Sequence, residues 1–221
     1  MKIVFVHDHK FCRDDSGAYY SDGQFPYELW ARYLQYFDEI IVMGRVRSLR
    51  EEESWGMLDL SSGPKVEFVE IPVPLHPGAR LFSSCKVKKR MEETIRHADG
   101  VIVRNGELAV LAAAVAQRLQ KLWAVEVVSR AFDGFWRHGS WLGKLYAPWA
   151  ELAMRRMVRK APFALYVTKE FLQKRYPCNG RTAACSDVQL DISPLADKQE
   201  RQKQDLLGKR VLRIGMIGSL T

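Results

Sequence analysis

The 221-residue sequence lacks any apolar run long enough to cross a membrane as a helix. Its longest apolar run extends from Leu108 to Ala116, and the first run, Ile3 to Val6, passes at once into His7 and polar residues. This pattern is not that of a secretory signal peptide. Four cysteines without the spacing of metal or redox motifs predict no metal and reduced thiols.

Phosphate-binding fingerprints are also missing. The sequence contains no Gly-x-Gly-x-x-Gly turn and no P-loop, which argues against a simple dinucleotide-binding or flavodoxin-like enzyme. No nucleic-acid-binding motif is present either. We therefore expect no nucleic acid partner.

What the sequence does have is positive charge: 34 lysines and arginines against 26 acidic residues give a net charge of +8. Such a balance favours a polyanionic partner, here an anionic membrane surface or a phosphorylated ligand. One basic cluster lies at 86–90. A second, at 155–160, follows Trp141, Tyr146 and Trp149 on a predicted helix. A basic amphipathic helix can lie on an anionic membrane, although a solvated helix face over a core stripe is the commoner explanation.

Short apolar runs alternate with helical periodicity along the first 190 residues. This alternation predicts an α/β domain with a doubly wound, mostly parallel, Rossmann-like sheet. The predicted strands are 2–7, 39–43, 66–73, 100–103, 123–128, 163–167 and 183–188, and the predicted helices are 25–37, 86–97, 107–122, 142–160 and 169–176. Pro148 should kink or split its helix, residues 45–63 should form a loop, and Thr168 should cap the last helix.

After residue 190 the composition changes. Residues 191–210 are polar and predict an interdomain linker, and residues 211–221 form an apolar strand that runs into a Gly215-x-x-Gly218 turn. A strand of this kind normally feeds a helix whose N-terminus can hold phosphate, which makes Gly218 a candidate donor-phosphate residue. We therefore expect 1–190 to be one domain and 211–221 to be the truncated start of a second.

Ligands of open parallel sheets bind beyond the carboxyl ends of the strands, which directs attention to the loops there. The first, His7 to Gly23, is long and polar; its candidate binding residues are Gly17, Tyr19, Tyr20 and Gly23. The glycines allow a ligand to approach the backbone closely. An ordinary surface loop with turn glycines is the alternative.

The next loop is Arg104 to Glu107. Arg104 can neutralise a phosphate, and Asn105 and Glu107 can bind sugar hydroxyls. The alternative, equally open, is a turn in which Asn105 caps the following helix and Glu107 stabilises its first turn.

A further loop, 129–140, combines charged and aromatic residues. Arg130 and Trp136 suit a carbohydrate or lipid-phosphate acceptor, and Asp133 or His138 could serve as a general base. A structural loop with its aromatics in the core is the alternative, and for His138 it is at least as good. The turn at Thr168 to Glu170 is best explained as a helix cap.

Four segments in order carry a family resemblance. They are Lys2-Ile-Val-Phe-Val-His-Asp-His-Lys-Phe11, Tyr20-Ser-Asp-Gly-Gln-Phe-Pro-Tyr27, Tyr166-Val-Thr-Lys-Glu-Phe171 and Ile214-Gly-Met-Ile-Gly-Ser219. Together they resemble glycosyltransferases of the family 4 type, which have two Rossmann-like domains facing a cleft (the GT-B fold). The resemblance covers essentially the whole chain, as the N-terminal domain plus the first strand of the C-terminal domain.

The resemblance implies that this chain binds the acceptor, a glycan or lipid-linked molecule, while the C-terminal domain binds a nucleotide-sugar. Gly23 would approach the donor phosphate, although the family's two adjacent glycines are reduced here to Gly23 and Gln24. It implies a retaining reaction without a metal, in capsule, exopolysaccharide or lipopolysaccharide assembly. The location implied is cytoplasmic, peripheral on the inner face of the membrane. The alternative is a lone, non-catalytic module that binds a glycan or lipid phosphate.

Overall fold

The structure is a computed structural model that describes residues 1–48, 58–71, 79–136 and 141–185, with side chains described from residue 85 onward in the helix that begins at 79. The predicted linker and the predicted strand at 211–221, with Gly218, lie outside the described residues. So does His138.

The described residues form a nine-stranded, mainly parallel sheet with the order β4-β2-β1-β6-β7-β8-β9, and β3 pairs with β1 while β5 pairs with β3. The strands are β1 (Lys2–Arg13), β2 (Tyr19–Ser21), β3 (Glu39–Ser48), β4 (Asp59–Leu60), β5 (Val66–Ile71), β6 (Gly100–Arg104), β7 (Leu122–Val127), β8 (Phe163–Tyr166) and β9 (Arg181–Ala184). Only the pairings of β2 with β1 and with β4 are antiparallel within this sheet. The predicted α/β class with a parallel, Rossmann-like sheet is confirmed.

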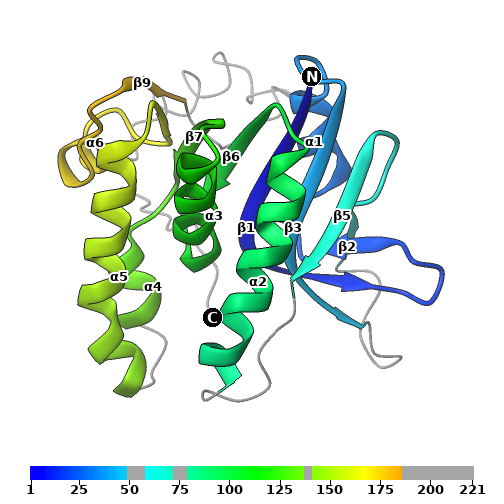
Figure 1. Ribbon diagram of the computed structural model, residues 1–221, viewed down its shortest axis with the longest axis horizontal. Helices are drawn as coiled ribbons and strands as arrows, with labels where there is room; N and C mark the ends of the chain where they lie inside the picture. Colours follow the sequence, from blue (N-terminus) through cyan, green and yellow to red (C-terminus); the bar gives the residue numbers. More distant parts are fainter. Residues whose placement is uncertain (49–57, 72–78, 137–140, 186–221) are drawn as a thin grey trace, which may run out of the picture. The chain divides into compact units, whose positions relative to one another are not determined.

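Six helices accompany these strands in the described part of the chain: α1 (Tyr27–Tyr33), α2 (Ala79–Arg96), α3 (Glu107–Arg118), α4 (Ala131–Trp136), α5 (Trp141–Lys160) and α6 (Phe171–Arg175). Figure 1 shows α2, α3 and α5 side by side over one face of the sheet. Their apolar sides, with Met91, Ala112 and Met154, are buried against strand residues such as Val103 and Val125 in the larger core.

The other face of the sheet carries a smaller, aromatic core. Phe5, Phe11 and Phe25 pack there around Trp30 of α1, which is fully buried. Each such side chain contributes roughly 1.5–3 kcal/mol by leaving water. This core fixes α1 against β1 and β3, and with them the strand ends from which the site is built.

The region that follows the first apolar run is where the sequence prediction is wrong. The predicted strand ends at His7, but β1 continues to Arg13 and β3 continues to Ser48, into the predicted loop 45–63. The parallel register between β1 and β3 shifts between Val6 and Lys10 and then resumes. Beyond this irregularity Phe11 is buried again, so burial resumes after a stretch that reads as polar in the sequence.

Helix bounds also differ from the prediction, and α1 and α3 each end four residues earlier than predicted. Helix α4 occupies part of the predicted loop 129–140, α2 begins at Ala79 instead of residue 86, and Pro148 does not split α5. Helix α6 begins at Phe171 with Glu170 as its N-cap residue, two residues later than predicted, but Thr168 Oγ1 still accepts a hydrogen bond from the Leu172 N–H in its first turn at 3.0 Å. Within the described ranges, no helix is both long and apolar enough to pass through a bilayer.

Candidate functional site

The carboxyl ends of three neighbouring strands, β1, β6 and β7, bring the predicted loops together. Val6 lies opposite Val103, and Arg104 lies opposite Glu126, so the residues after these pairs share one edge of the sheet. A pocket of about 230 Å³ opens at this edge. It is lined by Asn105, Gly106, Glu107, Val110, Ser129, Arg130, Ala131, Gly134, Phe135, Tyr146, Ala150, Ala153 and Met154. We call it the edge pocket.

Asn105 joins two loops of the edge pocket instead of capping α3. Its Oδ1 accepts a hydrogen bond from the Val128 N–H at 2.9 Å, and its Nδ2 donates to Ser129 Oγ at 3.0 Å. The N-cap residue of α3 is Gly106, whose φ of +155° favours glycine, so the alternative in which Asn105 caps the helix is wrong. A sugar contact of Asn105 stays a prediction.

Asp8 of β1 supplies the acceptor for the start of α3. Its Oδ2 accepts the Leu108 N–H at 2.8 Å, and its Oδ1 accepts Arg45 Nη2 at 3.0 Å. The same Arg45 nitrogen lies 3.5 Å from Glu107 Oε2. Burial raises the pKa of Asp8, against the hydrogen bond from Leu108 and the charge of Arg45. Arg45 thereby holds two carboxylates beside the edge pocket.

Arg104 turns to the opposite side, toward α1. Its Nε lies 3.2 Å from Glu126 Oε2, and its guanidinium carbon lies 5.3 Å from the Phe25 ring centre. Glu126 is only 6% exposed and also accepts the Tyr33 hydroxyl. Burial, and then the charge of Glu126, raise the pKa of Tyr33. Arg104 is thus held by a buried carboxylate, and its expected phosphate contact stays a prediction.

Arg104, Glu126 and Tyr33 line a second, more apolar pocket of about 530 Å³. Its walls come from α1 and from the side chains of Ile102, Ala124 and Leu165 on the sheet face. Two of the predicted site residues, Arg104 and Asn105, are adjacent in sequence but line different pockets. This separation follows from the alternation of side chains along a strand.

Arg130 lines the edge pocket just before α4, whereas Asp133, in the first turn of α4, and Trp136 are not among the lining residues. Arg130 Nη1 is 3.5 Å from Asp133 Oδ2, and the guanidinium lies 5.9 Å from the Phe132 ring centre. Trp136 stacks on Phe132 at 5.1 Å and is 48% exposed. Arg130 and the Asp133 carboxylate are therefore close together, and the role of Asp133 as a base stays a prediction.

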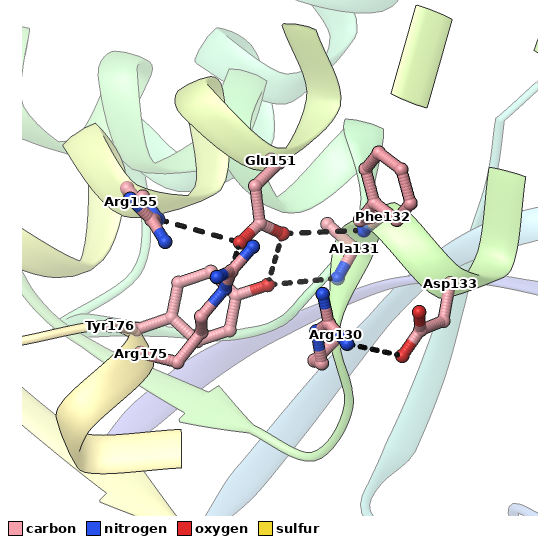
Figure 2. Close-up of polar contacts among 8 residues, drawn as sticks. All are labelled: Arg130, Ala131, Phe132, Asp133, Glu151, Arg155, Arg175 and Tyr176. Carbon is pink, nitrogen blue, oxygen red and sulfur yellow. Dashed lines mark hydrogen bonds and ion pairs between the residues drawn. The ribbon is translucent and has the colours of Figure 1, made fainter. Parts of the chain in front are cut away.

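The short helix α4 is held by a carboxylate that the sequence analysis missed. Glu151 of α5, only 6% exposed, accepts the Tyr176 hydroxyl and Arg175 Nε, both at 2.6 Å, and the Phe132 N–H at 3.3 Å. The Tyr176 oxygen in turn accepts the Ala131 N–H at 3.0 Å. Figure 2 shows Glu151 at the centre of these contacts, with Arg130 and Asp133 beside them.

The backbone N–H groups of Ala131 and Phe132, which have no acceptor within α4, are thus hydrogen-bonded by Tyr176, just beyond α6, and by Glu151 of α5. Burial alone would raise the pKa of Glu151, but the hydrogen bonds from Tyr176 and Arg175 outweigh it, and the pKa is lowered. The sequence does contain a sign of this role. Glu151 is a single carboxylate at an apolar position of an otherwise basic helix, and a buried carboxylate requires hydrogen-bonding partners.

The predicted residues of the first loop lie apart from the edge pocket. Tyr19 and Tyr20 are in β2, which pairs with the end of β1. Tyr19 stacks on Phe68 at 4.2 Å and donates to Glu70, and the Tyr20 hydroxyl donates to Asp14. Gly17 and Gly23 have φ values of +88° and +79°, as turn glycines do. None of these four residues lines the edge pocket, and their ligand contacts stay predictions.

Two histidines of β1 lie between these regions. The His9 N–H donates to His7 Nδ1 at 3.0 Å, and His9 Nε2 is 2.9 Å from Ser21 Oγ, which also accepts the Phe25 N–H. Burial, with the charges of Arg104 and His9, lowers the pKa of His7 to about 3. Burial also lowers the pKa of His9. Both rings are therefore neutral near pH 7 and serve as hydrogen-bonding groups.

Among the residues that the structure describes, no group of three or more His, Cys, Asp or Glu side chains is placed to hold a metal ion. The arrangement instead offers one guanidinium and aromatic rings around an open pocket. Such a combination can bind an anionic or hydroxylated ligand.

Comparison with known proteins gives one sequence relative and a set of similar folds. The chain is 33% identical to Protein CapJ of Staphylococcus aureus over 220 residues, which is 99% of this chain and 53% of that protein. The chain therefore spans about half the length of this curated relative. No family model matches the sequence.

A solved UGT transferase from Siraitia grosvenorii, in complex with UDP, aligns over 93% of this chain and 55% of its own, with a TM-score of 0.50 and 14% identity. At this identity the likeness concerns the fold alone. The chain thus has a glycosyltransferase-like fold that corresponds to about half of that enzyme.

Proposed function

We propose that this chain is the acceptor-binding half of a two-domain glycosyltransferase of the GT-B, family 4 type. The observation that carries the proposal is the edge pocket, where the loops after β6 and β7 meet at the carboxyl edge of a parallel sheet. Ligands of open α/β sheets bind at this edge. The glycosyltransferase-like fold supports the same assignment.

The substrates follow from the proposal. The donor is a nucleotide-sugar; the UDP in the solved transferase complex supports this class. Its phosphates and sugar are bound mainly by the second half of the enzyme, so this chain alone is inactive. The acceptor is a glycan or lipid-linked molecule of capsule, exopolysaccharide or lipopolysaccharide assembly, as the family resemblance implies, and the reaction takes place on the cytoplasmic side.

In this scheme the chain orients the acceptor. Arg130 attracts an acidic group of the acceptor, while Phe135 and Tyr146 offer ring faces to a sugar. Asp133 or His138 removes the proton from the attacking hydroxyl, unless the donor phosphate does so. The reaction retains the anomeric configuration without a metal, and the contribution of this half is positioning and electrostatic field.

Calorimetric titration with nucleotide-sugars and with polyprenyl-phosphate sugars tests the proposal. We expect an acceptor to bind and nucleotide-sugars to bind weakly or not at all. Arg130→Gln should weaken acceptor binding by roughly 10- to 100-fold, the loss of one charge-assisted hydrogen bond. Lys174→Gln is the matched control, because Lys174 is exposed and pairs only locally with Glu170. Tight nucleotide-sugar binding that Arg130→Gln leaves intact would contradict the assignment.

A further inference from the structure

Helix α5 exposes a row of large apolar side chains. Trp141, Leu145 and Trp149 are 72%, 56% and 69% exposed, and Leu142 and Leu152 are also exposed. Spacings of three and four residues place them on one side of the helix, opposite the buried Ala147, Ala150 and Met154. Contiguous apolar patches of this kind on a soluble domain mark an interaction surface. We call these five side chains the exposed strip.

The same side of α5 becomes basic toward its end. Arg156, Arg159 and Lys160 are exposed and continue the exposed strip by one to two turns. The only acidic residue of α5 is Glu151, which is buried on the other side. Tryptophan and leucine followed by arginine and lysine, without an exposed carboxylate, is the composition of helices that lie in the interface of an anionic bilayer.

From this surface we infer that α5 is a membrane-docking helix whose exposed strip enters an anionic bilayer while its basic end binds lipid phosphates. The charge pattern favours a bilayer over a second copy of the chain. Two copies joined through this face would each bring the exposed cations of α5 and a net charge of +8 to the contact, and the face has no carboxylate of α5 to oppose them. An anionic headgroup layer offers the opposite charge over the whole length of the helix.

The placement of the edge pocket adds a consequence that rests on the proposed function. Tyr146, next to Leu145 of the exposed strip, lines the pocket and is 41% exposed. A bilayer that holds the exposed strip would therefore lie close to the pocket. A lipid-linked acceptor could then present its sugar to the pocket while its lipid stays in the membrane.

Co-sedimentation of the chain with vesicles tests the docking surface without any sugar substrate. We expect binding to phosphatidylcholine vesicles that contain phosphatidylglycerol, and much weaker binding to phosphatidylcholine alone. Trp149→Ser should weaken binding by roughly 10- to 100-fold through lost apolar burial. The double variant Arg156→Gln/Arg159→Gln should weaken it roughly five-fold for each cation removed.

Matched controls come from exposed residues elsewhere. Tyr36→Ser, in a residue that is 81% exposed, and Lys88→Gln/Lys89→Gln on α2 should each change binding by less than about two-fold, since these residues lie outside α5 with its exposed strip and basic end. Circular dichroism checks that the variants fold. Absence of binding to the anionic vesicles, or an equal loss in the controls, overturns the inference. So does a dimer in sedimentation velocity that Trp149→Ser dissociates, because the exposed strip would then contact a second copy.

Discussion

Replacing Glu151 should uncouple α4 from the rest of the domain. The Glu151 carboxylate is the acceptor for Tyr176, Arg175 and the Phe132 N–H, and Arg155 lies 3.4 Å from it. In Glu151→Ala the buried Tyr176 hydroxyl loses its acceptor, while Arg175, with 34% of its side chain exposed, can turn to solvent. The loss is therefore smaller than for a fully buried ion pair.

The magnitude can be built from these contacts. An unsatisfied buried hydroxyl costs about 1–3 kcal/mol, and a charge-assisted hydrogen bond contributes about 1.5–3 kcal/mol. After the exposure of Arg175 is allowed for, we expect a decrease of about 3 kcal/mol in the free energy of unfolding, toward the lower end known for broken buried pairs. A domain of this size should then melt roughly 6–12 °C lower.

Urea denaturation measures this change, and hydrogen exchange locates it. Amides of residues 131–136 should exchange faster in Glu151→Ala, because the Phe132 N–H loses its acceptor and the Ala131 N–H is bonded to a Tyr176 hydroxyl that is no longer held by Glu151. Glu170→Ala is the matched control; its exposed pair with Lys174 contributes less than about 0.5 kcal/mol. Unchanged exchange in α4, or a decrease below about 1 kcal/mol, would refute the role of Glu151, since a buried group with these partners must cost more.

Two further predictions concern the strand edge. Gly106→Ala should lower the free energy of unfolding by about 3 kcal/mol, because a Cβ at φ +155° would lie 2.2 Å from Asp8 Oδ2 and displace the cap of α3. Urea denaturation measures this change. Gly134→Ala is the control: its Cβ would meet nothing within 4 Å, so the variant should be neutral or stabilising. The lowered pKa of His7 means that the unfolded chain binds its proton first as pH falls below 6.5, so stability should decrease toward pH 5 by about 1.4 kcal/mol per pH unit for this group. His7→Gln should remove one proton from that slope, and an identical slope in the variant would contradict the assignment.

The strands were predictable where short apolar runs are buried on both faces. Val4, Val6, Val101 and Val125 belong to such runs, and each lies in a core strand as expected. The continuation of β1 to Arg13 was not predictable, because residues 7–10 (His-Asp-His-Lys) are all polar and show neither an apolar run nor an alternation of apolar and polar residues. Beyond these residues β1 pairs with β3 again after a register shift, and this pairing depends on a strand that is distant in the sequence.

The candidate site was likewise predictable in part: the meeting of its loops could be predicted, but the contacts of its side chains could not. Parallel order alone implied that the loops after 103 and 128 would meet, and Asn105, Glu107 and Arg130 do line one pocket. Local sequence was misleading at Asn105. Ser, Asn or Asp just before a helix usually caps it, but Asn105 does not cap α3. Here the cap comes from Asp8, almost one hundred residues earlier, and the side chain of Asn105 is engaged by the neighbouring loop.

Helix α5 brings the two proposals into one testable arrangement. Trp149 and Glu151 are two residues apart and point to opposite sides of the helix, one exposed and one buried. A variant at Trp149 should therefore weaken vesicle binding and leave the free energy of unfolding unchanged, whereas a variant at Glu151 should do the reverse. If both variants altered both properties equally, the helix would act as a single structural unit, and neither face could be assigned a separate role.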